Sequence, residues 1–364
     1  MTAMVRDEAD IIASMLDHHL EQGVDQFVVT DNGSVDGTCE ILEDYASRGV
    51  LDLRHDPIHR KQQATTVSIM ARDAYTTHGA TWVLNADADE FWLPEDRNRR
   101  LKDVFESIPT TLRAFTAPVV DMTGAPAISG SGLGRLRYRD HRPVEMLKEV
   151  GLYAHSTPNA VHVGSPSVEV VQGNHYVNIE SLGEPDIADR VEVLHLPWRS
   201  WDQYRRKVDN AGRAYLNNSG LTPSPNHHGM RDWRRLEEGV LYALYLARHP
   251  APTELKSGMA HGHFVEDFSL GHIVGGVADE LVPAAENSEL SLLGRAIVRR
   301  DRAVSDLAAQ LDETRTNLEY LRLNSDAAIR LSETKRREVE QLVEGLRHKK
   351  VVRLSDALAT FFRR

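Results

Sequence analysis

Apolar runs that alternate with helix-like segments over the first hundred residues constrain the fold of this chain more than any other feature. Residues 9–20 place apolar side chains four apart, which predicts a helix that ends at Gly23. Residues 39–47 and about 62–77 predict two further helices. Short apolar runs typical of buried strands lie before and between them: TAMV, QFVVT, VLDLRH and TWVLNA. Strands alternating with helices predict an α/β domain with a mostly parallel central sheet.

Acidic clusters follow two of the predicted strands. Residues 31–36 follow QFVVT, and Asp87, Asp89 and Glu90 follow TWVLNA. Because ligands bind at the carboxyl ends of parallel strands, we expect the two clusters to meet in the fold. Side chains two apart in an extended segment point to the same side, which brings Asp87 and Asp89 together. Hard oxygen ligands of this kind favour Mg²⁺ or Mn²⁺, and such ions usually bind phosphate oxygens as well.

The second cluster has three other possible interpretations. A calcium loop would need glycine where Glu90 stands, and it would not follow a strand. An aspartyl phosphatase also carries Asp-x-Asp at a strand end, but normally on its first strand and followed by small residues. A plain solvated acidic turn is the third interpretation, and only an independent match elsewhere in the chain argues against it.

Composition excludes some classes of protein. A net charge of -11 argues against a nucleic-acid-binding protein, which normally shows a basic balance. A single cysteine, Cys39, cannot form an internal disulfide, so a reducing compartment fits best and a small core residue is the favoured interpretation. We find neither a signal-peptide pattern nor an apolar run of about 18 residues, so a cytoplasmic protein is expected.

The middle of the chain is mixed in character. Residues 110–195 are rich in loops, and ISGSGLGRLRYRDHRP (128–143) is expected to be a mobile segment whose arginines are solvated or grip an anionic acceptor. Residues 198–250 are predicted to be helical, with Trp198 and Trp201 either stacking on a ligand or packing in the core. His261 and His263 have zinc-like residue types, but packing is the favoured interpretation because cysteine ligands are missing.

The last part of the chain predicts a long amphipathic helix from about residue 291. Its apolar residues follow a seven-residue repeat that Ser325, Ser332 and Lys335 interrupt. A coiled coil that pairs two chains and a helix folded on its own domain both remain open. The basic and apolar end, KKVVRLSDALATFFRR, suits contact with the inner face of the cell membrane or packing on protein. The repeat is formed by Val304, Leu307, Leu311, Leu318, Leu321, Val339, Leu342 and Leu346.

A longer motif supplies the independent match. VRDEADIIASMLDHHLEQGVDQFVVTDNGSVDGT, followed later by DADEF, resembles the family 2-type glycosyltransferases of GT-A fold, in particular the bacterial branch related to glycosyltransferase family 92. HLPWRSWDQYRRKVDNAGRAY, residues 195–215, is also similar to that branch. Asp7 departs from the asparagine that the family often has, and the first strand is short. The resemblance covers about residues 3–215 and implies a Rossmann-like GT-A domain over residues 1–215. The helical patterns that follow predict an extension packed on the core over 216–290 and the long helix over 291–364.

The same resemblance implies roles for individual residues. Asp87 would lie beside the ribose and the metal, and Asp89 would be the main metal ligand. A later histidine often completes the site, and His162 is the first candidate, ahead of His175 and His195. The nucleotide-sugar would contact Glu8 and Asp31 through its base or ribose, lie in a pocket shaped by Asn32, Ser34 and Asp36, and present its diphosphate to Lys148 and Arg199.

The function implied is that of an inverting, Mn²⁺- or Mg²⁺-dependent glycosyltransferase. It would move a sugar from a nucleotide-diphosphate donor to a hydroxyl of a glycan or glycolipid. A carboxylate must take the proton of the acceptor hydroxyl, with Glu145 the first candidate beside Glu149 and Asp209. Two alternatives stay open: a sugar-phosphate nucleotidyltransferase, which the sequence RDEADI after the first strand disfavours, and a non-catalytic partner protein that binds nucleotide-sugars.

Overall fold

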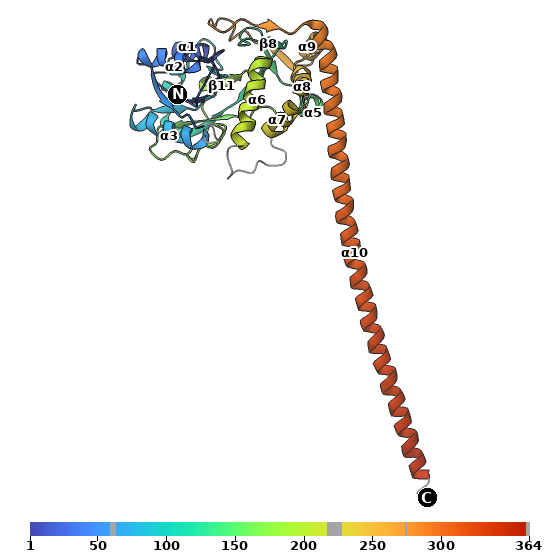
Figure 1. Cartoon of the computed structure of the whole chain (residues 1–364). Coiled ribbons are helices and arrows are strands. Elements are labelled where there is room, and N and C mark those ends of the chain that lie inside the picture. Colours follow the sequence, from blue (N-terminus) through green and yellow to red (C-terminus); the bar gives the residue numbers. More distant parts are fainter. Residues whose placement is uncertain (59–62, 217–227, 274, 362–364) are drawn as a thin grey trace. The chain divides into compact units, whose positions relative to one another are not determined.

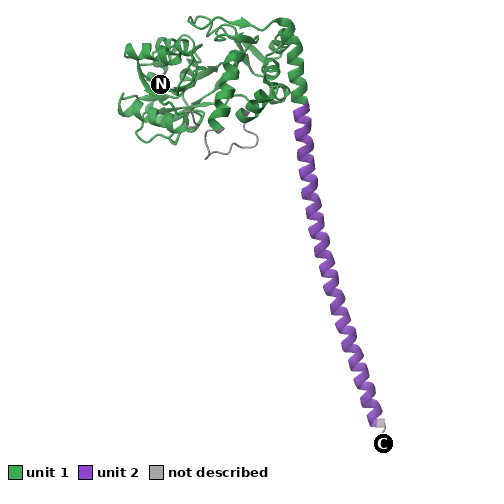
Figure 2. Ribbon diagram, in the orientation of Figure 1, with its two compact units in different colours: residues 1–299 green, residues 300–364 purple. Residues whose placement is uncertain are grey.

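The computed structural model of the protein describes residues 1–58, 63–216, 228–273 and 275–361. The chain divides into two compact units, residues 1–299 and residues 300–364, which Figure 2 distinguishes by colour. The first unit holds the sheets, and the second consists of the later part of a long helix.

A central sheet with parallel strands forms at the N-terminal side of the first unit. Its strands are β1 (Thr2–Val5), β2 (Phe27–Asp31), β3 (Leu51–His55), β4 (Trp82–Leu84), β6 (Ala114–Ala117) and β10 (Asn159–Val163). β2 pairs in parallel with both β1 and β3, and a parallel bridge from Thr2 to Asn85 joins β1 to β4. β10 is antiparallel to β4 and β6. The predicted strands and their mostly parallel arrangement are confirmed in this part of the chain.

Helices cover both faces of β2, as the alternation of its side chains requires. Val28 belongs to the apolar cluster that contains Met70 of α3 (Gln63–Thr76). Val29 belongs to a larger cluster that contains Leu16 of α1 (Ile12–Glu21) and Leu42 of α2 (Thr38–Ser47). Because neighbouring residues of a strand point to opposite faces, α3 and α1 lie on opposite sides of this sheet. Full burial of each such side chain contributes about 1.5–3 kcal/mol.

A second sheet brings later parts of the chain beside the first. Its central strand β11 (Val191–His195) is antiparallel to β5 (Glu90–Pro94) and parallel to β7 (Val119–Thr123). The register pairs His195 with Glu90, and so brings the start of the HLPWRS segment to the acidic strand end. The sheet continues through β9 (Tyr138–Asp140) to β12 (Phe264–Glu266), and β8 (Ala127–Ser129) pairs with β13 (Glu280–Leu281).

The predicted mobile segment, residues 128–143, is instead packed against residues 277–279. The backbone N–H of Ser131 donates to the carbonyl oxygen of Val277 at 3.0 Å. Gly130 has φ +115°, and a Cβ there would lie 2.6 Å from the Cα of Asp279, so only glycine fits this close approach. Arg135 forms an ion pair with Asp279 at 3.0 Å. Gly130 therefore allows close packing rather than flexibility. Arg135 is paired with Asp279, a carboxylate of the chain itself.

The helices after β11 include α6 (Trp201–Leu216), which packs beside α7 (His228–Glu237) (Figure 1). Trp201 contacts Tyr242 and Tyr245 of α8 (Leu241–Arg248), with ring centroids 4.8 and 5.9 Å apart. The Arg248 guanidinium lies 5.6 Å from the Trp198 ring. The packing interpretation of both tryptophans is therefore the one that the structure shows.

The remaining helices connect or terminate these layers. Helix α10 begins within the first unit, and residues 303–360 are all exposed. None of the helices among the described residues is both long enough and apolar enough to cross a membrane. The remaining elements are α4 (Leu101–Ser107), η1 (Thr110–Leu112), α5 (Val144–Glu149), η2 (Ile187–Asp189), α9 (Pro252–Ala260) and α10 (Ala284–Phe361).

Candidate active site

The strands β1, β2 and β4 run in parallel and end at one edge of the central sheet, where acidic residues follow each of them. Asp31, the last residue of β2, pairs in register with Val5, the last residue of β1. Glu8 follows β1, and Asp87 follows β4. The edge is therefore lined by carboxylates from three separate segments.

The loop after β2 is held in one conformation by its own polar side chains. Asp31 Oδ2 accepts hydrogen bonds from the backbone N–H groups of Gly33 and Ser34 at 3.1 and 3.2 Å. The Asn32 amide donates to the carbonyl oxygens of Asp56 and Ile58 at 2.8 and 3.1 Å. These bonds join the loop to the residues after β3. Asn32 therefore fixes the loop, and its role in shaping a nucleotide-sugar pocket stays a prediction.

Two further side chains of the loop bind the segment that follows β1. Ser34 Oγ accepts a hydrogen bond from the backbone N–H of Asp7 at 3.0 Å. Asp36 Oδ2 accepts one from the backbone N–H of Ala9 at 3.2 Å. Asp7 has φ +56°, a conformation that asparagine and aspartate tolerate better than most residues. Hydrogen bonds thus join the loop after β2 to the segment after β1 at this edge of the sheet.

The Asp89 carboxylate is buried and surrounded by cations. Its Oδ2 lies 2.8 Å from the Lys207 ammonium, 3.2 Å from Arg199 Nη1 and 3.8 Å from His195 Nε2. These neighbours hold the pKa of Asp89 well below its ordinary value, although burial alone would raise it. Asp89 is therefore ionised and is the electrostatic centre of the cluster.

Asp87 and Glu90 lie beside this centre in a more negative setting. Gln63 and Asn174 each donate to Asp87 Oδ1 at 3.1 Å. Glu90 Oε2 accepts hydrogen bonds from the Asp87 backbone N–H at 3.0 Å and from the Asn159 amide at 2.8 Å. Burial, and then the charge of a neighbouring carboxylate, raises the pKa of Asp87 and raises that of Glu90 to about 8.

Arg199 joins the acidic regions. Its side chain is fully buried and donates to Asp10 Oδ2 at 2.9 Å and Oδ1 at 3.1 Å. It also forms an ion pair with Glu8, and it contacts Asp89. Burial raises the pKa of Glu8 to about 7, with Arg199 opposing the shift. The two acidic clusters lie at the same edge of the sheet and are connected indirectly: the backbone N–H of Glu8 donates to Thr38, the first residue of α2, and Arg199 links the Glu8 side chain to Asp89.

His195 connects the cluster to the second sheet. Its Nδ1 lies 2.9 Å from Asp121 Oδ1 while its Nε2 faces Asp89. Although burial favours the neutral ring, Asp121 and Asp89 raise the pKa of His195 to about 10. Asp121 is held in turn by Ser156, whose Oγ donates at 2.6 Å. His195, a lower-ranked histidine in the sequence analysis, is the one that reaches Asp89.

The sequence patterns do not identify Lys207 and Asp121 as site residues. Lys207 lies in the segment HLPWRSWDQYRRKVDNAGRAY, which the resemblance covers without assigning a role to this position. Asp121 carries no local signal, because only the pairing of β7 with β11 brings it to His195.

The preferred histidine, His162, lies elsewhere in the central sheet. It pairs in register with Val83 of β4, and its Nδ1 lies 2.9 Å from the carbonyl oxygen of Val163. Burial lowers the pKa of His162 to about 4. For His175, the second candidate, Nδ1 lies 3.2 Å from Asn159 Oδ1. The amide of Asn159 in turn donates to Glu90, so Asn159 connects His175 to the acidic cluster. In this arrangement His175 and His195 border the acidic cluster more closely than His162 does.

Two residues expected to act on the donor or the acceptor form a pair on α5. Lys148 Nζ lies 2.7 Å from Glu145 Oε1, and 74% of the Glu145 side chain is exposed. Asp209, the third candidate base, pairs with Arg213 at 2.9 Å on α6. Lys148 thus makes its ion pair with Glu145 rather than with the carboxylates after β4.

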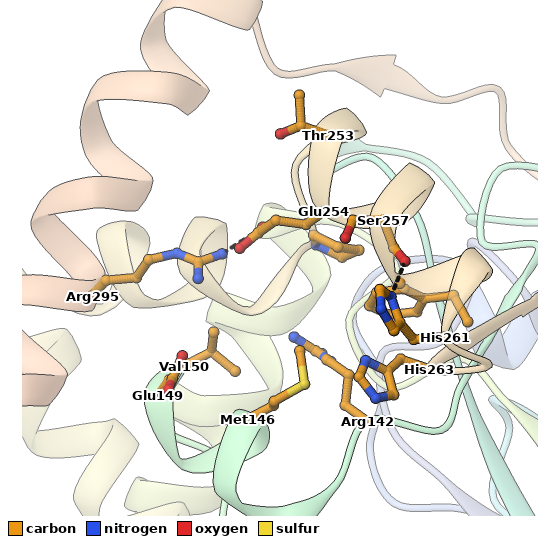
Figure 3. A pocket seen from close by; sticks show the side chains of 13 residues that line it. Arg142, Met146, Glu149, Val150, Thr253, Glu254, Ser257, His261, His263 and Arg295 are labelled. Atoms are coloured by element: carbon orange, nitrogen blue, oxygen red, sulfur yellow. Dashed lines mark hydrogen bonds and ion pairs between the residues drawn. The ribbon is translucent and has the colours of Figure 1, made fainter.

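Glu149 lines a separate cavity of about 390 Å³ between α5, α9 and the first part of α10. Figure 3 shows Arg142, His261 and His263 along one side of it and the Arg295–Glu254 ion pair, at 2.7 Å, along the other. His261 Nδ1 contacts the carbonyl oxygen of Ser257 at 2.8 Å. The histidine pair therefore lies in the lining of a cavity.

The donor set at the strand end fits a hard divalent cation. Within the described residues, the hydrogen bonds to Asp87 go to Oδ1 and the bond from Lys207 to Asp89 goes to Oδ2, so one oxygen of each carboxylate accepts none. Burial is the largest cause that raises the pKa values of Glu8 and Glu90, and the charges of Asp89 and Asp87, respectively, raise them further. Oxygen ligands in a region of excess negative charge are the environment that Mg²⁺ and Mn²⁺ prefer.

Fold and site together define an α/β protein with a buried acidic centre at the ends of parallel strands. Residues 1–114 match the family model described as Glycosyltransferase family 92, and this segment is a glycosyltransferase family 92 domain. The resemblance inferred from the motifs is thereby confirmed over these residues. A comparison with curated proteins finds no match.

Solved structures also show some likeness to the chain. The crystal structure of S. aureus TarS 1-349 shares 12% identity with it at a TM-score of 0.33, covering 68% of this chain and 78% of that one. The same protein in complex with UDP-GlcNAc gives 12% and 0.33 over 68% and 79%. Its complex with UDP gives 12% and 0.30 over 68% and 81%. At this level of identity and these TM-scores, the likenesses assign no activity to this chain.

Proposed function

We propose that the protein is an inverting, divalent metal-dependent glycosyltransferase. It transfers a sugar from a nucleotide-diphosphate donor to a hydroxyl of a glycan or glycolipid. The observation that carries this proposal is the placement of Asp89, buried among Lys207, Arg199 and His195 at the end of β4, in a chain whose first 114 residues match glycosyltransferase family 92.

The loop after β2 is the proposed pocket for the nucleoside. Asp31, Asn32, Ser34 and Asp36 hold this loop against the segment after β1, and Asp31 is buried at its base. A loop fixed by its own hydrogen bonds loses little conformational entropy when a ligand binds. The diphosphate of a nucleotide in this pocket would extend toward the end of β4.

Basic side chains at the strand end suit a diphosphate leaving group. Departure of the nucleoside diphosphate builds negative charge on its terminal phosphate, and fixed positive charge stabilises that change. Lys207 and Arg199 supply such charge within 3.2 Å of Asp89. A divalent cation, when bound, would be held by Asp87 and Asp89 and would neutralise further diphosphate charge.

Inversion requires a carboxylate to take the proton of the acceptor hydroxyl, and Glu145 is the proposed base. Its exposed position on α5 leaves it accessible to an acceptor, and Glu149 lies one turn further on the same helix. Replacing a general base typically lowers kcat about 10²–10⁴-fold. Glu145→Gln should therefore lower transfer strongly while Glu149→Gln does not. The reverse pattern would move the base to Glu149.

A thermal-shift screen of nucleoside diphosphates, with and without Mn²⁺, tests the donor and the metal together. One nucleotide should raise the melting temperature only when Mn²⁺ is present, because ligand binding stabilises the folded state. The Asp89→Asn variant should lose this shift. An equal shift in the absence of Mn²⁺ would argue against metal dependence, and no shift with any nucleotide would argue against a nucleotide-sugar donor.

We also propose that residues 300–361 pair two chains in a coiled coil. Apolar side chains that belong to the seven-residue repeat are exposed on α10, including Leu307, Leu311 and Leu318. Sedimentation of the full chain and of a Leu311→Lys, Leu318→Lys variant should show a dimer and a monomer respectively. A monomeric full chain would contradict the pairing.

The basic end of α10 has a second proposed role at an anionic membrane surface. Val351, Leu354 and Leu358 are exposed and lie between lysines and arginines. Flotation with anionic vesicles should recover the full chain, and vesicles of neutral lipid should not. Equal recovery with both would exclude an electrostatic anchor.

A further inference from the structure

A sulfur, an imidazole nitrogen and a carboxylate oxygen gather where β2 and β3 end. Asp31 and His55 are register partners on these adjacent parallel strands, so their side chains leave the sheet on the same side. Cys39 lies in the first turn of α2, which packs on β3. One ligand atom from each of these residues lies within 4.8 Å of the others.

The separations at Cys39 approach those between the ligands of a bound metal, and those to Asp31 lie within 4.8 Å. Cys39 Sγ is 3.9 Å from His55 Nδ1 and 3.8 Å from Oε1 of Glu43, one helical turn further along α2. Bonds of 2.0–2.3 Å to a tetrahedral zinc ion place ligand atoms about 3.3–3.8 Å apart. His55 and Glu43 are exposed, so small side-chain rotations suffice to bring their ligand atoms into range.

The third ligand, Asp31, is held in place by the backbone. The N–H groups of Gly33 and Ser34 both donate to its Oδ2, and such bonds orient carboxylates in metal sites. Burial, followed by the charges of Asp31 and Glu43, raises the pKa of the Cys39 thiol. The surroundings of the sulfur are therefore negative. They disfavour a free thiolate and attract a cation.

We propose that Cys39, His55 and Asp31 form a binding site for Zn²⁺, with Glu43 or a water molecule as the fourth ligand. A sulfur–zinc bond forms as the thiol proton is released to solvent, and no electron is transferred. The mixture of sulfur, nitrogen and oxygen ligands distinguishes this site from the oxygen ligands of Asp87 and Asp89. It also revises the expectation that Cys39 is a core residue, because the side chain is only half buried.

A consequence follows for the donor pocket, and it rests on the proposed function. Asp31 is shared between the zinc site and the proposed nucleoside pocket. Zinc bound at Asp31 would occupy the carboxylate that the nucleoside needs. Zn²⁺ should therefore weaken binding of the nucleoside diphosphate and act as an inhibitor of transfer.

Titration of the metal-free full chain with Co²⁺ tests the site directly. A thiolate-to-metal charge-transfer band should grow to one equivalent and disappear when Zn²⁺ is added. Cys39→Ser should abolish the band, and His55→Ala should weaken binding at least tenfold, whereas Asp89→Asn should leave the band unchanged. Absence of the band in the wild-type protein, or an unchanged affinity in His55→Ala, would overturn the proposal.

A second titration separates this inference from the proposed function. The apparent Kd of the nucleoside diphosphate selected by the thermal-shift screen should rise at least tenfold with saturating Zn²⁺ in the wild type, but not in His55→Ala. An unchanged Kd in the wild type would overturn the inhibitory role. If no nucleoside diphosphate binds at all, the proposed function fails, while the Co²⁺ band still decides whether the metal site exists.

Discussion

Two buried ionic clusters in the first unit have opposite balances of charge. At the strand ends, the carboxylates of Glu8, Asp10, Asp87, Asp89 and Glu90 lie around the cations of Arg199, Lys207 and His195. Between α6, α7 and α8, the carboxylate of Asp232 lies 2.8 Å from Arg248, 3.2 Å from Arg235 and 3.7 Å from Arg231. Tyr204 also donates its hydroxyl to Asp232 at 2.6 Å.

The pKa shifts express this difference. The arginines hold the pKa of Asp232 far below its ordinary value despite its burial. At the strand ends, burial and neighbouring carboxylates raise the pKa values of Glu8 and Glu90 to about 7 and about 8. Buried ion pairs alone therefore do not identify a functional site in this protein. An excess of buried charge of one sign indicates a candidate site, because it is costly for the fold and is relieved when a ligand of opposite charge binds.

The largest expected effect comes from Asp89→Asn, which tests whether the strand-end cluster serves the reaction. Removal of one preorganised electrostatic group typically lowers kcat about 10²–10³-fold, and loss of the central carboxylate should reach the upper end of this range. Donor turnover and transfer should be measured per folded molecule, with circular dichroism as the control for folding. Turnover close to that of the wild-type protein would remove Asp89 from the mechanism.

Asp232→Asn tests whether the α6–α8 cluster serves the stability of the fold. This substitution leaves the buried guanidinium of Arg248 without its carboxylate, and breaking a buried pair costs about 3–5 kcal/mol. Urea denaturation should show a loss of unfolding free energy of that size. Turnover per folded molecule should stay within about twofold of the wild-type value. A stable but inactive variant would show that the α6–α8 cluster also serves the reaction.

The dependence of stability on pH should separate the clusters over the range from about 6.5 to 8. Glu8 and Glu90 have folded-state pKa values raised above their ordinary value of 4.5. The folded state therefore binds their protons more tightly, and the resulting stability is lost as pH rises through about 7 and about 8. The melting temperature should fall over this range, and less steeply in Glu90→Gln.

Other groups with shifted pKa values determine why the pH range from about 6.5 to 8 is the informative one. His18 and His162, whose folded-state pKa values are lowered to about 4, reduce stability only as pH falls below 6.5. The stability that His195 contributes through its pKa, raised to about 10, is also lost as pH rises, as it is for Glu90. The measured quantity is therefore the difference in slope between wild type and Glu90→Gln. Identical slopes would mean that the Glu90 carboxyl does not retain its proton in the folded state.

Local sequence patterns predicted the first half of the fold and the strand-end carboxylates of the candidate site. Strand-like runs followed by acidic residues located Asp31, Asp87 and Asp89, because position at a parallel strand end depends only on local order. His195, Asp121 and Lys207 converge through pairing between distant segments, which no local pattern reports. The glycines at 130–134 suggested flexibility, but Gly130 is needed for close contact with Asp279. Composition alone does not distinguish these two uses of glycine.

The smallest and most discriminating effect is expected from Asp87→Asn. An asparagine can still accept the hydrogen bonds from Gln63 and Asn174 through its side-chain oxygen, but it removes one negative charge from a cluster that has too many. The variant should therefore be more stable than the wild type, by about 2–4 °C in melting temperature for each kcal/mol gained.

The matching substitution at Asp232 should instead lower the melting temperature, because the Asp232 carboxylate lies among arginines. Added Mn²⁺ should raise the melting temperature of the wild type more than that of Asp87→Asn, because the cation and the substitution relieve the same repulsion. A destabilised Asp87→Asn protein would mean that the strand-end carboxylates are balanced within the fold, and the contrast between the two clusters would then disappear.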